Sequence, residues 1–314
     1  KPPKADIAGA GAGAAEALFG IAGNFRQQNV RETALLLARI ALYLRPDFPP
    51  GQVLIADILE NDGRFAAANA VYEGIGKDSA FQRPTRARIA VNLDRLDRTD
   101  EAAGRLNALA QADPGDAEPL IQLGDILRAR KRFKESVAAY DRAIARAPVL
   151  ERRHWAWLYS RGIALERSDQ WPRAEADFLQ ALVFEPEQPH VLNYLGYSWI
   201  EKRQNMDRAT DMIRRAVALR PNDGYIVDSL GWVHYQLGDW ADAATVLERA
   251  VELRPEDPVI NDHFGDALWR VGRRVEARFQ WERVLTLKPE SDQIEPIKRK
   301  LEEGLPDVPP AGKS

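Results

Sequence analysis

The 314-residue sequence contains no cysteine and only two methionines. The missing cysteine excludes disulfide bonds, thiol nucleophiles and thiolate-bound metal or iron–sulfur centres. No apolar run approaches the roughly 18–20 residues of a membrane helix, because even the longest candidate, 34–44, contains Arg39. The 44 basic and 47 acidic residues nearly balance, leaving a net charge of −3. We therefore expect neither a membrane span in this chain nor a nucleic-acid partner.

Signatures of catalysis are also missing. The four histidines, His154, His190, His234 and His263, show no metal-ligand spacing, and no Gly-x-Ser-x-Gly is present. The glycine-rich stretch 9–14 does not follow a strand as a dinucleotide loop would. We expect no enzyme, no catalytic residue, no cofactor and no metal. Because residue 1 is lysine and no signal segment precedes it, we also expect a processed or shortened chain, so the sequence does not reveal the compartment.

The sequence does contain a repeat of about 34 residues. One column of the repeat is proline, with Ala80 as its exception: Pro46, Pro114, Pro148, Pro186, Pro221, Pro255 and Pro289. A second is always alanine or glycine: Ala22, Ala56, Ala90, Gly124, Gly162, Gly196, Gly231 and Gly265. A third is small throughout: Ala34, Ala68, Ala102, Ser136, Ala174, Ala209, Ala243 and Ala277.

These columns predict pairs of closely packed helices. Each unit holds two amphipathic stretches with a period of 3.6 residues, joined by a short turn that often carries glycine, as at Gly63, Gly238 and Gly272. Small side chains let two antiparallel helices approach, and a larger one would overpack at a cost of roughly 1–3 kcal/mol. Proline ends the second helix because it cannot continue the hydrogen-bond ladder.

This pattern resembles the tetratricopeptide repeat. The resemblance implies an all-α, right-handed superhelical solenoid of about eight repeats, with a C-terminal capping helix at 292–303 that covers the last apolar face. We expect a flexible leader at 1–14 and a disordered tail at 304–314. The predicted repeats span 15–48, 49–82, 83–116, 117–150, 155–188, 189–223, 224–257 and 258–291.

Function is expected on the concave face, which the first helix of each pair lines. Aromatic, amide and carboxylate side chains gather there in the C-terminal half, and they suit an extended or helical peptide. The predicted binding residues are Tyr159, Asn193, Tyr197, Tyr225, Asp228, Trp232, Tyr235, Asp262, Asp266 and Trp269. Because the three aspartates lack a facing set of lysines and asparagines, we expect an apolar or basic partner segment. The alternative is that neighbouring units, the chain's own termini or a second copy cover these rings.

Three segments, 193–199, 223–232 and 262–272, are similar to a group of bacterial tetratricopeptide proteins that are often lipoproteins of the cell envelope. Some members of that group present substrates to a carboxyl-terminal-processing protease. The resemblance implies a non-catalytic adaptor in the periplasm or at the outer membrane, which recruits a protease or assembly enzyme. A cytoplasmic chaperone-like or assembly adaptor and a self-associating structural protein remain alternatives.

Overall fold

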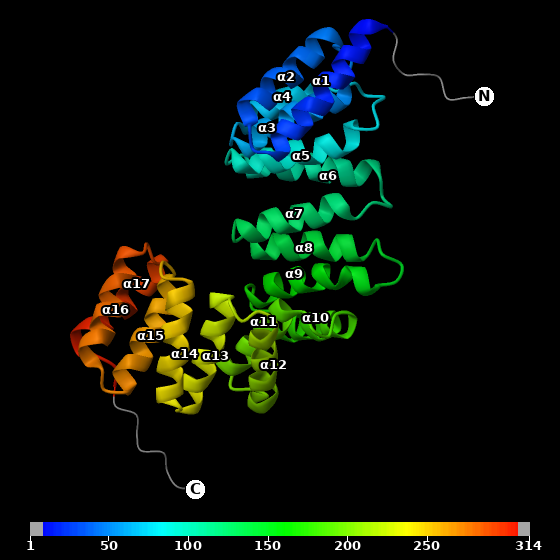
Figure 1. The fold of residues 1–314 in the computed structure, drawn as a ribbon. Helices are drawn as coiled ribbons and strands as arrows, with labels where there is room; N and C mark the ends of the chain where they lie inside the picture. Colours follow the sequence, from blue (N-terminus) through cyan, green and yellow to red (C-terminus); the bar gives the residue numbers. More distant parts are fainter. Residues whose placement is uncertain (1–8, 307–314) are drawn as a thin grey trace. The chain divides into compact units, whose positions relative to one another are not determined.

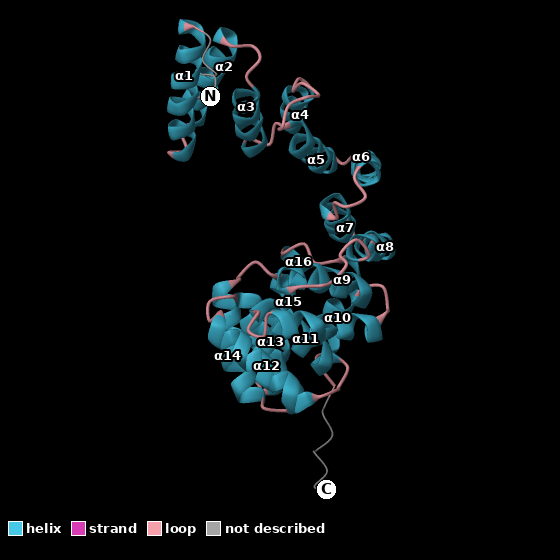
Figure 2. Ribbon diagram, turned by 90° about the vertical axis from the view of Figure 1, so that its right-hand side faces the viewer, coloured by secondary structure: helices cyan, strands magenta, loops and turns pink. Residues whose placement is uncertain are grey.

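A computed structural model describes residues 9–306, which contain helices and loops and no strand (Figures 1 and 2). The described residues form seventeen α-helices and one short 3-10 helix, η1 (Arg152–His154). The α-helices are α1 (Ala10–Gln27), α2 (Arg31–Leu44), α3 (Pro49–Asn61), α4 (Phe65–Glu73), α5 (Gln82–Arg95), α6 (Thr99–Ala112), α7 (Glu118–Ala129), α8 (Phe133–Ile144), α9 (Trp155–Glu166), α10 (Trp171–Phe184), α11 (Pro189–Glu201), α12 (Met206–Leu219), α13 (Gly224–Leu237), α14 (Trp240–Leu253), α15 (Pro258–Arg270), α16 (Arg274–Thr286) and α17 (Ser291–Glu303).

The helices follow one another as eight pairs, α1/α2 to α15/α16, and α17 comes after the last pair. The prediction of an all-α repeat fold is confirmed. Helix α1 begins at Ala10, so residues 10–14 are helical and the flexible leader expected there is a wrong prediction. Residues 1–8 and 307–314, which hold the remainder of the expected leader and most of the expected tail, lie outside the described residues.

The small-residue columns lie where the helices of a pair meet. Ala22, Ala56 and Ala90 are completely buried. A Cβ atom added to Gly124 would lie 2.6 Å from the ring of Tyr140, a distance that real Cβ atoms do not show. Each small residue on the first helix therefore makes room for a side chain of the second helix, as close packing requires.

The turn within every pair contains at least one residue with a left-handed backbone. The φ angle lies between 52° and 85° at Asn29, Gly63, Asp97, Lys131, Asp169, Arg203, Gly238 and Gly272, and the turn with Arg203 contains a second such residue, Asn205, with a φ of 47°. Glycine adopts this conformation without strain, which explains three of these positions. The other residues accept a local cost of roughly 1–2 kcal/mol.

Arginines join successive repeats in the C-terminal half. Arg215, Arg249 and Arg283 occupy the same position in three successive second helices, α12, α14 and α16. Each guanidinium donates to the carbonyl of a residue in the proline column: Arg215 to Pro186 at 3.2 Å, and Arg249 to Pro221 and Arg283 to Pro255 at 2.8 Å. Each of these carbonyls lies in the loop two residues after the end of the preceding second helix, so the bond ties one repeat's second helix to the loop of the repeat before it.

The chain divides into two compact units, which are described separately. Unit 1 comprises Lys1–Leu150 and Ser160–Ala174, and unit 2 comprises Glu151–Tyr159 and Glu175–Ser314. Within unit 1 the first helices contact their successors at α1–α3 and α5–α7, and within unit 2 at α11–α13 and α13–α15. The described second helices make no comparably extensive contact with one another. In each unit the first helices therefore line the inner side of the curve.

No helix among the described residues is both long enough and apolar enough to pass through a lipid bilayer.

Candidate functional site

Nine of the ten predicted binding residues lie on the inner side of unit 2, where eight of them form three groups and Trp269 lies outside these groups. The first is an aromatic patch on α9 and α11, which we define as Tyr159, Asn193, Tyr194 and Tyr197. All four side chains are half-buried. The ring of Tyr194 meets that of Tyr159 edge-on, with centroids 6.2 Å apart, and lies 5.2 Å from the ring of Phe178 beneath. Tyr194 is therefore a member of the patch that the sequence columns did not single out.

Two polar groups of the patch lack hydrogen bonds. The Asn193 side-chain oxygen is buried and accepts no hydrogen bond. Such unsatisfied groups are uncommon in folded proteins. One helical turn further on, the Tyr197 hydroxyl makes no hydrogen bond with the described residues. Burial, followed by the nearby charges of Glu201 and Asp228, raises the pKa of Tyr197, so this hydroxyl is a neutral donor at physiological pH.

The second group is a stack of rings centred on Trp232 of α13. Tyr235 covers one side of the indole, with centroids 4.7 Å apart and planes at 7°. His263 of α15 also stacks on it, at 4.0 Å and 16°. The indole N–H donates to Glu201. Trp232 is thus largely engaged within the chain, and a partner would meet its edge rather than a free face.

His263 is the residue of this group that sequence reasoning missed. Its Nδ1 lies 3.0 Å from the carboxylate of Asp228, and both side chains are buried. Burial acts to lower the pKa of His263, but the charge and hydrogen bond of Asp228 outweigh it and raise that pKa. Asp228, predicted to face a partner, instead lies within hydrogen-bond distance of His263 of the next repeat.

The third group contains Asp262 and Asp266 of α15, which α17 neutralises. The Lys300 ammonium lies 2.6 Å from Asp262 and 2.7 Å from Asp266. Burial and the negative charge of Asp262 raise the pKa of Asp266 to about 6, against the opposing effect of Lys300. The carboxylates that favoured a basic partner therefore already have a cation from this chain. A basic peptide would have to displace Lys300.

Trp269 is covered by the segment that follows α17. Its ring lies 5.4 Å from that of Trp281, and the guanidiniums of Arg274 and Arg278 lie 5.1 and 5.6 Å from its centre. A Cβ atom on Gly304 would come within 2.0 Å of the Trp269 ring, and the φ of 73° at Gly304 also favours glycine. At this ring the alternative interpretation holds, because the chain's own C-terminal segment lies against the indole.

Tyr225, the tenth predicted residue, lies apart from these groups. It is the second residue of α13, is 51% exposed and has the guanidinium of Arg254 5.0 Å from its ring centre. With Arg254 and Asp257 it borders a separate pocket of about 280 Å³. No ring or polar contact joins it to the aromatic patch.

The column that contains Asp266 also has a structural explanation. In three repeats an aspartate at this position accepts a hydrogen bond from a ring donor fifteen residues later. The pairs are Asp57 with Tyr72 at 3.3 Å, Asp125 with Tyr140 at 2.7 Å, and Asp266 with Trp281 at 3.0 Å. In the other five repeats the facing second-helix residue has no side-chain O–H or N–H: Ala38, Leu106, Phe178, Ile213 and Leu247. These aspartates therefore satisfy buried donors within the repeat.

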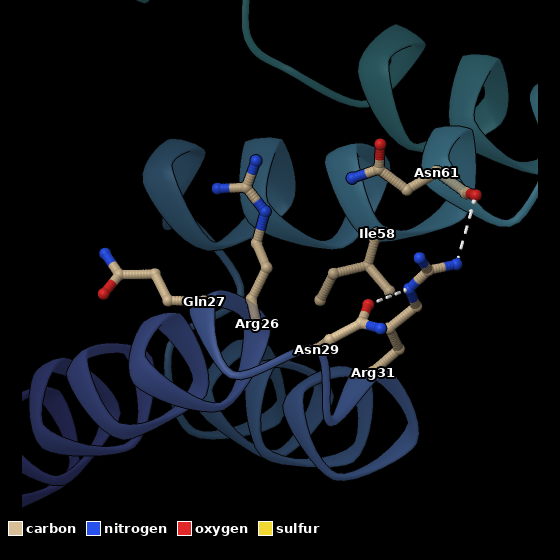
Figure 3. Close-up of a pocket in the computed structure, with 6 residues that line it drawn as sticks. All are labelled: Arg26, Gln27, Asn29, Arg31, Ile58 and Asn61. Atoms are coloured by element: carbon tan, nitrogen blue, oxygen red, sulfur yellow. Dashed lines mark hydrogen bonds between the residues drawn. The ribbon is translucent and has the colours of Figure 1, made fainter. Parts of the chain in front are cut away.

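Unit 1 presents a different kind of site, a polar pocket of about 350 Å³ beside the α1–α2 turn (Figure 3). Its wall includes Arg26, Arg31 and the edge of Ile58. Arg26 lies 3.4 Å from Asp57, and Arg31 lies 3.2 Å from Asp62. Since both guanidiniums already have carboxylate partners, the pocket has no uncompensated positive charge from these arginines with which to attract an anion.

The fold and this inner surface define a helical-repeat scaffold. Models of the tetratricopeptide repeat match residues 88–151, 159–224 and 227–257, which together make up half of the chain. The chain belongs to the tetratricopeptide repeat family. The matched models describe a repeat used in protein interaction and not an enzyme family, and the described residues contain no cluster of side chains that could hold a metal ion.

Similar proteins share the repeat over part of their length. TPR repeat-containing protein PA4667 of Pseudomonas aeruginosa is 29% identical over 177 residues, which are 56% of this chain and 29% of that protein. RNA polymerase-associated protein CTR9 of Caenorhabditis elegans is 25% identical over 181 residues, 51% of this chain and 15% of that protein. The chain thus matches less than a third of either relative. A chain in the crystal structure of the APC/C hetero-tetramer Cut9–Hcn1 shares the fold, with a TM-score of 0.63, 15% identity, and coverage of 88% of this chain and 53% of that one.

Proposed function

We propose that this protein is a non-catalytic adaptor that binds an apolar peptide segment of a partner protein on the aromatic patch of α9 and α11. The observation that carries the proposal is the unpaired Asn193 oxygen beside half-buried tyrosine rings. The rings supply apolar area, and the Asn193 oxygen, after a small rotation, is an acceptor for a backbone N–H of the peptide.

The energy of the rings sets the size of the partner segment. Complete burial of an aromatic side chain covers about 150–250 Å², or roughly 4–6 kcal/mol at 25 cal/mol/Å². The patch rings are already half-buried, so each offers about half of that amount. Association costs about 4–15 kcal/mol. A peptide must therefore engage Tyr159, Tyr194 and Tyr197 together, and we expect an extended segment with at least two apolar side chains.

The other predicted residues have supporting roles in this proposal. Asp262 and Asp266 hold the Lys300 ammonium and Asp228 contacts His263, so these carboxylates do not require a basic partner. The stack of Trp232 and Tyr235 borders the patch on the next first helix, and its exposed edges extend the apolar surface. We accordingly favour an apolar segment over a basic one.

A more specific role, as a bacterial envelope adaptor for a protease or assembly enzyme, is part of the proposal and rests on the sequence resemblance of segments 193–199, 223–232 and 262–272. A cytoplasmic adaptor would use the same patch. Fractionation of cells that produce the protein from its own gene distinguishes the two: recovery with the envelope fraction supports the first, and recovery with the cytosol supports the second.

Site-specific photocrosslinking tests the binding surface. A photoreactive phenylalanine analogue replaces Tyr197 in one variant and Val183 in another, because Val183 is 69% exposed on the outward side of α10. The proposal predicts that, in cells, the Tyr197 variant crosslinks to a discrete partner segment rich in apolar residues and that the Val183 variant does not. Equal crosslinking of both variants, or none at Tyr197 while the outward position reacts, contradicts it.

A further inference from the structure

One position of the first helices carries an arginine in the third repeat, α5/α6, and a buried residue in every later repeat. The position lies four residues before the alanine or glycine column. In repeats four to eight it holds residues at most 2% exposed: Leu120, Leu158, Leu192, Val227 and Asn261. In the third repeat it holds Arg86, whose side chain is exposed. A charged residue at a position that the fold otherwise buries gives up packing energy, so its presence needs a separate reason.

The second helix of the same repeat has an exceptional arginine of its own. Arg105 of α6 is exposed, whereas the residues at its position in the other seven repeats are buried or half-buried: Leu37, Val71, Ala139, Asp177, Met212, Val246 and Gln280. Three residues further on, Ala108 occupies the position at which Arg215, Arg249 and Arg283 bind the loop of the preceding repeat. The third repeat thus has charge where other repeats pack, and a short side chain where three of them form a bridging bond.

The seventh repeat shows how the same place looks when it is packed. There, Val227, Ala250 and Ile260 form a buried cluster, against which Val246, Val251 and Leu253 pack. The residues of the third repeat equivalent to Val227, Val246, Ala250 and Leu253 are Arg86, Arg105, Leu109 and Ala112. These four residues and Ala108 line a pocket of about 290 Å³. The pocket therefore lies where another repeat of this chain has an apolar contact, and the fold does not require it.

The pocket combines positive charge with an apolar wall. Arg86 forms no ion pair with the described residues; its Nε and Nη2 lie 2.7 Å from the amide oxygen of Gln82 when that amide is turned to accept. Arg105 lies 3.2 Å from Glu73, and both side chains are about half exposed, so this pair is weak and can rearrange. Together the two arginines and Glu73 leave one net positive charge. Leu109 supplies the largest apolar side chain of the wall.

We propose that this pocket binds a monocarboxylate that carries a short branched apolar chain. Arg86 Nη1 takes no part in the bond to Gln82, and guanidinium N–H groups match the planar geometry of a carboxylate. One net positive charge fits a monoanion better than a phosphate dianion, and the apolar chain lies against Leu109. The volume is near the lower limit of roughly 300 Å³ for ligand sites, which restricts the ligand to a small one.

Saturation-transfer NMR with the full chain and 4-methylpentanoate tests the proposal. We expect saturable binding with a Kd of about 0.1 to 1 mM, as suits a ligand of this size, and the strongest transfer to its methyl protons. The neutral 4-methylpentanamide should bind at least tenfold more weakly. N-acetyl-leucine distinguishes two sources of this chemistry. Tighter binding than 4-methylpentanoate assigns the pocket to the carboxyl end of a polypeptide, and weaker binding assigns it to a free acid.

Two variants place the ligand in this pocket. Arg86→Gln and Arg105→Gln should each raise the Kd at least fivefold with unchanged circular dichroism. Arg39→Gln is the matched control, because Arg39 is an exposed arginine of α2 in the same unit, and it should leave the Kd unchanged. Absence of saturable binding, equal binding of the acid and the amide, or an unchanged Kd in both pocket variants overturns the proposal. The pocket lies in unit 1 and the aromatic patch in unit 2, so this proposal and the proposed function can fail independently.

Discussion

Replacing Lys300 with methionine removes the ammonium that bridges Asp262 and Asp266 at 2.6 and 2.7 Å while keeping the apolar stem. The side chains of Lys300 and Asp266 are 18% and 9% exposed, so water cannot fully replace the lost partner. Removing one member of a buried ion pair typically costs about 3–5 kcal/mol. Asp266 can limit this cost by taking up a proton, because its pKa of about 6 is already raised.

The pH dependence follows from that raised pKa. The folded state binds a proton at Asp266 more tightly than the unfolded state, whose carboxyl has a pKa near 3.8. The contribution of this group to stability therefore falls as pH rises through about 4 to 6, and loss of Lys300 extends the fall to higher pH. We expect Lys300→Met to destabilise the last repeat by about 2 kcal/mol at pH 8 but only about 1 kcal/mol at pH 5.

Hydrogen exchange of the segment 258–303 measures this locally, which suits an array whose repeats can open separately. Lys298→Met is the matched control on the same helix, since Lys298 is exposed and pairs only with the exposed Glu295. It should change stability by less than about 0.5 kcal/mol. An equal loss at pH 5 and pH 8 for Lys300→Met, or the same loss for both variants, refutes the reasoning.

Three further predictions concern single positions. Arg203→Gly should raise the free energy of unfolding by up to about 1 kcal/mol, because Arg203 has a left-handed φ of 52°. Gly238→Ala should lower it by about 1 kcal/mol, because the φ at Gly238 is 85°. Denaturant midpoints measure both changes. Tyr140→Phe removes the hydroxyl that donates to the Asp125 carboxylate at 2.7 Å, and it should lower the free energy of unfolding in urea by about 1–1.5 kcal/mol. An unchanged free energy of unfolding would show that this hydrogen bond does not stabilise the repeat. The raised pKa of His263 predicts stability that declines as pH rises above about 6.5, and His263→Gln should flatten that decline in thermal melts at pH 6 to 9.

The repeat could be predicted because close helix packing restricts the size of the side chain at single positions of the sequence. Alanine or glycine at Ala22, Gly124 and Gly265 identifies where helices touch, and glycine at Gly238 marks a left-handed turn. These constraints act on one residue at a time and recur with the period. The start of α1 was misjudged because residues 9–14 are only alanine and glycine, and such a stretch lacks the apolar periodicity that identifies a helix.

The site was only partly predictable because the environment of each side chain depends on a partner residue in another helix. Asp266 looked like a free carboxylate when its column was considered alone, although the ring donor fifteen residues later signals its partner, Trp281. The Asp228–His263 pair joins two repeats, and Lys300 continues the same column into α17. The cover over Trp269 depends on the path of the chain at Gly304, for which the sequence carries no periodic signal.

The affinity of the crosslinked partner segment, as a synthetic peptide, for the Tyr197→Ala variant tests the central claim most directly. Loss of one half-buried ring and its hydroxyl should cost at least about 2 kcal/mol, or a rise in Kd of roughly 30-fold by isothermal titration calorimetry. Val183→Ala on the outward side of α10 should leave Kd unchanged. Identical Kd values for the wild type and Tyr197→Ala would contradict binding at the aromatic patch.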